Sequence, residues 1–307
     1  MKKRFKSRKT KKFNLTKVFL LILVTLVSLY TSYNIIYHTY LSKLSNYEII
    51  THIITNTKNN KYEGTLIDNY LNPKNIISNN FKLKENQSIT VEKEIQKEPL
   101  IYIYSTHETE SYQDKYLELY NIKPTVKTMS LILQDYLSDY GIPTIVEDSS
   151  ITDILRSNSW SYKYSYSASR IAIEDTIKNT NSLKLIIDLH RDSSKLEKTL
   201  LEYNNTKYAR ILFVVGKEHD SYESNYKLSE ELRNLLEETI PGITRGINLK
   251  EGAGVNGIYN QDLSPNCILI ELGGQYNEIE ELNNSIEVLA KVFLKYLEGE
   301  GWKKVIK

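Results

Sequence analysis

Two hydrophobic periods alternate along the chain from Leu100 onward, one typical of strands and the other of helices. Short apolar runs predict strands at residues 100–104, 142–148, 182–190, 209–216 and 267–272. Apolar residues at helical spacing predict helices at 125–141, 165–179, 226–240 and 282–297. Strands that alternate with helices predict an α/β fold whose mainly parallel sheet is covered by helices on both faces.

The N-terminal part has a different pattern. Residues 1–17 are basic, residues 18–37 are mostly apolar, and no acidic residue precedes Glu48. A basic segment followed by roughly 20 apolar residues predicts a cytoplasmic tail and a single transmembrane helix. A cleaved secretory signal is the alternative, but the segment lacks a small-residue cleavage site. We therefore expect a single-pass protein of the cell membrane, with residues 38–98 as a stalk or small membrane-proximal region and 99–307 as an extracytoplasmic domain.

Charge and cysteine content narrow the function further. The net charge is only +2, and the positive charge is concentrated at the N-terminus, so nothing favours a nucleic-acid partner. Cys267 is the single cysteine, which excludes an intramolecular disulfide framework. Because it opens an apolar run, we interpret it as a small buried hydrophobic residue.

Three residues whose side chains can bind a metal or transfer a proton stand at or just beyond the ends of predicted strands. His107 and His190 are two of only five histidines, and Glu271 precedes a pair of glycines. Sheets of this kind bind ligands beyond the carboxyl ends of their strands. The topology therefore predicts that these side chains gather at one edge of the sheet.

Two imidazoles and a carboxylate are the ligands of a catalytic zinc that keeps one position open for water. Glu110, in the same loop as His107, is a candidate third ligand, and Glu271, from another strand, suits a general base. The alternative for each residue is ordinary: a histidine hydrogen-bonded in a loop, or a solvated acid. The residues alone leave both interpretations open.

Several ordered sequence blocks resemble one family. The blocks "IYIYSTHETESY", "YSYSASR", "IIDLHRDS", "ARILFVVGKEH", "PGITRGI" and "YNQDLSPNCILIELGGQYN" occur in that order between Leu100 and Leu297. They are similar to the stage II sporulation protein P family of membrane-anchored cell-wall hydrolases.

The resemblance implies a zinc-dependent N-acetylmuramoyl-L-alanine amidase acting on peptidoglycan during engulfment of the forespore, with a zinc-amidase-like fold. It also implies endopeptidase activity on stem-peptide cross-links and work beside stage II sporulation proteins D and M. By position it makes His107, Glu110 and His190 the zinc ligands and Glu271 the catalytic base. The alternatives are a non-catalytic wall-binding or complex-forming module, and an endopeptidase only.

Two further points concern the site. Many family members have histidine where this chain has Ser105, and we expect that position to be secondary, so that Ser105→His changes turnover little. Arg170, Arg191 and Arg245 are equal candidates for binding a stem-peptide carboxylate or for pairing within the fold.

Overall fold

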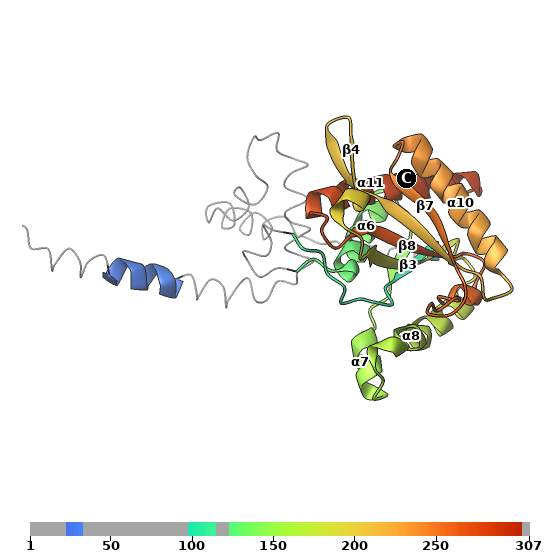
Figure 1. The fold of residues 1–307 in the computed structure, drawn as a ribbon, viewed down its shortest axis with the longest axis horizontal. Helices are drawn as coiled ribbons and strands as arrows, with labels where there is room; N and C mark the ends of the chain where they lie inside the picture. Colours follow the sequence, from blue (N-terminus) through green and yellow to red (C-terminus); the bar gives the residue numbers. More distant parts are fainter. Residues whose placement is uncertain (1–22, 33–97, 115–122, 303–307) are drawn as a thin grey trace, which may run out of the picture. The chain divides into compact units, whose positions relative to one another are not determined.

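The structure is a computed structural model that describes residues 23–32, 98–114 and 123–302 (Figure 1). The chain divides into two units, Met1–Ser45 and Asn46–Lys307, which are described separately. Residues 23–32 of the first unit are helical. The Thr31 hydroxyl bonds back to the carbonyl oxygens of Val27 and Ser28, each at 3.0 Å.

Most of the N-terminal organisation expected from the sequence falls outside the described residues. This applies to the basic tail at 1–17, to much of the segment 18–37, and to nearly all of 38–98. Within the described ranges, no helix combines the length and apolar character that crossing a membrane requires. The membrane anchor thus stays a prediction.

The second unit is built on a six-stranded sheet in the order β2-β1-β3-β8-β6-β7. Four of its five pairings are parallel, and only β6 with β8 is antiparallel. The expected mainly parallel sheet is confirmed. The strands are β1 (Ile101–Tyr104), β2 (Thr144–Val146), β3 (Leu185–Asp192), β6 (Ile211–Gly216), β7 (Thr244–Lys250) and β8 (Cys267–Gly274).

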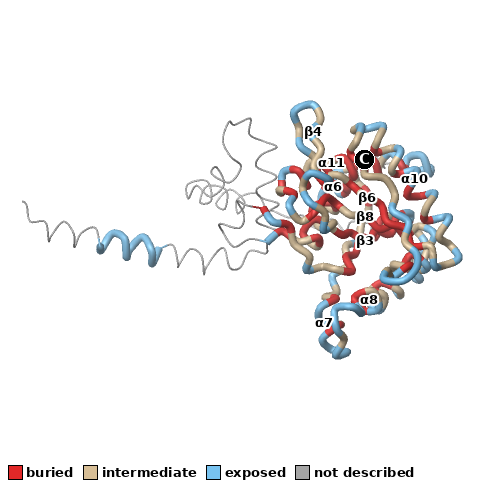
Figure 2. The backbone as a smooth tube through the Cα atoms, in the orientation of Figure 1, coloured by how far each residue is buried: buried red, intermediate tan, exposed pale blue. Residues whose placement is uncertain are grey.

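The centre of the sheet is covered on both faces. All four residues of β1 are at most 2% exposed, although successive side chains of a strand point to opposite faces. On one face, Ile173 and Ile177 pack with Tyr102 and Tyr104 in a single apolar cluster. Figure 2 shows the buried chain concentrated along β3, β8 and β6. This burial explains why these strands are nearly continuous apolar runs in the sequence.

Five longer helices accompany the sheet in residues 123–302, and the first of them begins at a side-chain cap. Thr125 caps the first of them by accepting a hydrogen bond from the Thr128 N–H at 3.2 Å. The first and last helices are joined by the Tyr136 hydroxyl, which donates to Asn283 Oδ1 at 3.0 Å. The helices are α6 (Val126–Asp139), α7 (Ile151–Ser157), α8 (Ser165–Asn179), α10 (Tyr222–Thr239) and α11 (Ile279–Gly299).

Some elements were not predicted from the sequence. The hairpin of β4 (Leu200–Tyr203) and β5 (Thr206–Ala209) turns at Asn204 and Asn205, both with positive φ. The arm of α7 and the short helix η2 (Tyr162–Tyr164) precedes α8, and Ile151 and Leu155 of α7 pack on Ala168 of α8. Also unpredicted are β7, the four-residue helix α9 (Leu196–Thr199) and the short helix η3 (Gln261–Leu263).

The carboxylate of Glu237 joins the end of α10 to the start of β7. It accepts hydrogen bonds from the Gly242 N–H at 2.7 Å, from the Thr244 N–H at 2.9 Å, and from the Thr244 hydroxyl. Burial alone would raise the pKa of Glu237, but these hydrogen bonds outweigh it and lower the pKa below its usual value.

Candidate active site

The loop after β1 is held against β3 by a buried carboxylate. Asp188 Oδ1 accepts from the Thr106 N–H at 2.9 Å, and Asp188 Oδ2 accepts from the Thr106 hydroxyl at 2.7 Å. Thr106 and Asp188 are each 1% exposed, and Ser169 Oγ lies 2.9 Å from the Thr106 hydroxyl. Because these bonds fix the residue before His107, they determine where the imidazole stands.

His107 and Glu110 lie in one tight turn that is attached to β8. The Glu110 N–H donates to the His107 carbonyl at 2.9 Å, and the Tyr112 hydroxyl donates to the Leu272 carbonyl at 3.0 Å. The backbone of Arg191 also bonds to the Glu110 carboxylate. The loop after β1 therefore contacts both β3 and β8 at their carboxyl ends.

His190 and Glu271 face each other across neighbouring parallel strands. They are register partners in the pairing of β3 with β8, and the register shifts between His190 and Asp192. Gly273 has a φ of +59°, and a Cβ built there would lie 2.7 Å from Asn277 Oδ1. Glycine at position 273, two residues after Glu271, is therefore required by backbone conformation and by packing against the protein itself.

The four predicted site residues are brought close together. The rings of His107 and His190 lie edge to face, with centroids 5.2 Å apart, and His190 carries charge close enough to act on both Glu110 and Glu271. Each of the four has one buried polar atom without a hydrogen-bond partner among the described residues: His107 Nδ1, Glu110 Oε2, His190 Nε2 and Glu271 Oε2. Asp188 Oδ1 lies 2.9 Å from that His190 nitrogen, so the two groups form an ion pair when the imidazole is protonated.

These atoms fit a metal in chemistry but do not form a complete coordination set. Two imidazole nitrogens and carboxylate oxygens are zinc donors, and unpaired buried polar atoms are costly unless something binds them. Within the described ranges, however, no group of three or more His, Cys, Asp or Glu side chains is arranged as metal coordination requires.

Burial and charge separate the protonation behaviour of the site residues. Burial lowers the pKa of His107 to about 4 and raises the pKa of Glu271 to about 7. Burial would likewise lower the pKa of His190, but Asp188 and the nearby glutamates outweigh it and raise the value to about 9. Burial raises the pKa of Glu110 as well. A carboxyl group whose pKa is near neutrality is suited to accept and return a proton.

An aromatic wall that was not predicted from the sequence surrounds the two histidines. Tyr162 stacks on His107 with centroids 4.8 Å apart, and it is 56% exposed. Tyr166 meets His107 edge to face at 5.7 Å and stacks on His190 at 6.3 Å. The signal in the sequence was the run "WSYKYSY", in which aromatic residues alternate from Trp160 to Tyr166.

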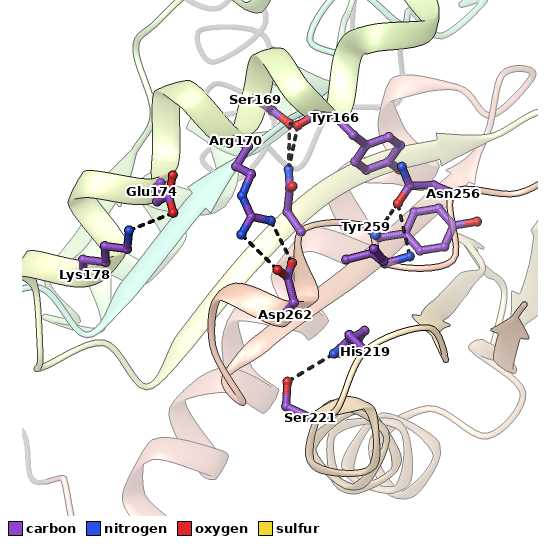
Figure 3. Close-up of polar contacts among 12 residues, drawn as sticks. Tyr166, Ser169, Arg170, Glu174, Lys178, His219, Ser221, Asn256, Tyr259 and Asp262 are labelled. Atoms are coloured by element: carbon purple, nitrogen blue, oxygen red, sulfur yellow. Dashed lines mark hydrogen bonds and ion pairs between the residues drawn. The ribbon is translucent and has the colours of Figure 1, made fainter.

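The glycine-rich loop before β8 completes this wall. Tyr259 meets Tyr166 edge to face with centroids 5.3 Å apart, and Asn256 Oδ1 accepts from the Tyr259 N–H at 2.6 Å (Figure 3). Asn260, with positive φ, donates to the Tyr166 carbonyl at 3.1 Å. The loop after residue 251 is thus anchored beside the site.

Cys267 and Ser105, two residues considered in the sequence analysis, are both buried in the structure. Cys267 is 2% exposed within the apolar cluster beneath α8, and burial raises the pKa of its thiol. Ser105 is 5% exposed, with its Oγ 3.3 Å from Ser130 Oγ of α6.

The fold and these residues define an α/β protein with a histidine and glutamate centre at the carboxyl ends of β1, β3 and β8. The sequence profile described as Stage II sporulation protein P (SpoIIP) matches residues 31–294. The chain belongs to this family. Stage II sporulation protein P of Bacillus subtilis (strain 168) is 35% identical over 201 residues, which cover 63% of this chain and 50% of that protein. The chain thus spans about half the length of this relative.

Two solved structures show weaker similarity. The CwlD amidase from Clostridioides difficile, solved in complex with the GerS lipoprotein, is 14% identical, with a TM-score of 0.43 over 65% of this chain and 99% of that chain. A metallo-carboxypeptidase from Burkholderia cenocepacia is 9% identical, with a TM-score of 0.39 over 69% of this chain and 60% of that chain. Both TM-scores lie below 0.5, so neither similarity supports an argument about fold or function.

Proposed function

We propose that this chain is a zinc-dependent peptidoglycan hydrolase that cleaves the amide between N-acetylmuramic acid and L-alanine during forespore engulfment. The proposal rests on four buried polar atoms, on His107, Glu110, His190 and Glu271, that have no hydrogen-bond partner among the described residues. Membership of a sporulation family supports the biological setting.

In this proposal, His107, Glu110 and His190 would hold the zinc ion, and Glu271 would move the proton. Zinc, when bound, would polarise the scissile carbonyl and make water acidic enough to react near neutral pH. Glu271 accepts a proton from the attacking water and returns it to the leaving alanine nitrogen. Its buried position and raised pKa suit both halves of that transfer.

The neighbouring residues position this chemistry. Asp188 fixes Thr106 and thereby the place of His107, while Tyr162 and Tyr166 contact the imidazoles. Reacting groups that are held in place in this way gain rate because little ordering remains for the transition state.

The proposed setting is the outer face of the cell membrane. The basic segment 1–17 followed by the apolar segment 18–37 supports a single-pass anchor with the hydrolase domain on the extracytoplasmic side. Peptidoglycan is then the substrate, and stage II sporulation proteins D and M are the proposed partners.

The test is digestion of purified peptidoglycan by the full-length chain, with products identified by mass spectrometry. The proposal predicts intact stem peptides released from glycan strands in the presence of zinc. Products cut only between stem-peptide residues would replace the amidase by an endopeptidase. Retention of the wall without cleavage, by protein that carries zinc, would favour a binding module.

A further inference from the structure

The three arginines near the site differ in what they bind. Arg170 makes two hydrogen bonds to Asp262, each 2.9 Å long (Figure 3), and Arg245 forms an ion pair with Asp192. These two guanidinium groups are engaged by carboxylates of the protein. Arg191 is not.

Arg191 lies next to His190 and has few partners. Its Nε is buried and has no hydrogen-bond partner within the described part of the chain. One terminal nitrogen makes a long contact of 3.4 Å with the Asp192 carbonyl. Of the ion pairs in residues 23–32, 98–114 and 123–302, all with N to O distances of at most 4.0 Å, none includes Arg191.

The position of Arg191 is set by the same loop that carries the proposed metal ligands. Its backbone bonds to the Glu110 carboxylate, and its charge partly opposes the burial that raises the pKa values of Glu110, Tyr112 and Tyr162. Arg191 is itself partly buried, and the neighbouring His107 carries Tyr162, which is 56% exposed, stacked on its ring.

A partly buried guanidinium without a carboxylate partner is unusual, because its five N–H groups match a carboxylate in a planar, two-pronged contact. If the role of Arg191 were purely structural, we would expect its guanidinium to make two hydrogen bonds to a carboxylate of the protein, as that of Arg170 does. Glu110 is near, but its oxygens are not within ion-pair distance. The unoccupied donors therefore point to a ligand.

We propose that Arg191 binds a carboxylate of the peptide substrate, on the peptide side of the scissile amide. This rests on the proposed hydrolase function and assigns it a preference for acidic peptides. An exposed arginine would add little selectivity, but a charge-assisted contact at a partly dry site is worth about 30-fold in kcat/KM.

The experiment compares two muramoyl peptides that differ only in the residue after alanine, which carries either a carboxylate or the matching carboxamide. We expect Arg191→Gln in the full-length chain to lose about 30-fold in kcat/KM on the carboxylate substrate and less than 3-fold on the carboxamide. Arg191→Lys keeps the charge without the fork and should fall between. Arg233→Gln on α10, whose guanidinium donates a hydrogen bond to the side chain of Asn234, is the matched control and should leave both rates unchanged.

Equal losses on both substrates would overturn the proposal, because they would place Arg191 in transition-state stabilisation instead. Unchanged rates on both would also overturn it. If the wild-type chain hydrolyses neither peptide, the proposed function fails, and titration of the uncleaved carboxylate peptide by NMR decides the inference separately. Weaker binding of this peptide by Arg191→Gln than by the wild-type chain would support the proposed role of Arg191. Equal binding by the two chains would refute that role. If Arg191→Gln does not fold, the comparison of Arg191→Lys with wild type on the two substrates decides.

Discussion

The bond between Thr106 and Asp188 is the contact that places the first histidine, and Thr106→Val tests it. Valine has nearly the same shape, so the substitution removes the hydroxyl while leaving the backbone N–H bond to Asp188 Oδ1 in place. Asp188 then keeps one of its two bonds from Thr106 and loses the other at a site that is 1% exposed.

The magnitude follows from that loss. A hydrogen bond to a buried charge contributes about 1.5–3 kcal/mol, so we expect Thr106→Val to lower the free energy of unfolding by about 2 kcal/mol. For a domain of this size the same loss corresponds to a fall in Tm of about 4–8 °C. Since His107 follows directly, hydrolysis should fall by at least about tenfold.

Urea unfolding of the full-length chain, followed by circular dichroism, measures the effect. Thr152→Val, at an exposed position of α7, is the matched control and should change the unfolding free energy by less than about 0.5 kcal/mol. If the two variants were equally stable, the bond from the Thr106 hydroxyl to Asp188 would not help to hold the loop, and this part of the explanation of how His107 is placed would be refuted.

Three other changes have defined outcomes. Glu271→Gln should lower hydrolysis by about 10²–10⁴-fold and leave bound zinc unchanged, measured by elemental analysis; loss of the metal as well would reassign Glu271 as a ligand. The pKa of Glu237 is lower in the folded state than in the unfolded state. Its contribution to the free energy of unfolding is therefore complete above the unfolded pKa of about 4.3, and it is lost as pH falls through the folded pKa. Glu237→Gln should therefore destabilise by about 1–3 kcal/mol at pH 7 and progressively less below pH 4, and a difference independent of pH would contradict this. Gly273→Ala should lower the free energy of unfolding by about 3 kcal/mol, because it adds a steric contact to the penalty of about 1–2 kcal/mol for positive φ. Gly246→Ala has open space around its Cβ and should show the smaller penalty alone. Equal losses of unfolding free energy in the two variants would refute the steric contribution.

The sheet could be predicted from the sequence because its central strands are buried on both faces. Such strands appear as uninterrupted apolar runs, and the helix predicted at 165–179 has the same bounds as α8. By contrast, β7 reads "TRGINLK", which has too few apolar residues to indicate a strand. It is a strand because it pairs with β6, and that pairing is not visible in local sequence.

The candidate site could be predicted in part for a related reason. The residues His107, His190 and Glu271 follow or end strands, so the topology alone brings them to one edge. The aromatic wall could not be placed in this way, since Tyr162 belongs to an arm whose position depends on packing between α7 and α8. The roles of the arginines also required the structure, because only the ion pairs of Arg170 and Arg245 distinguish them from Arg191.

The most direct test of the central claim is a zinc titration of the metal-free full-length chain during digestion of purified peptidoglycan. We expect the release of stem peptides to rise with added zinc and to reach a plateau at one zinc ion per chain. Release that is unaffected by zinc, or the absence of release from a chain that has bound one equivalent, would contradict the assignment of His107, Glu110, His190 and Glu271 to a zinc hydrolase centre.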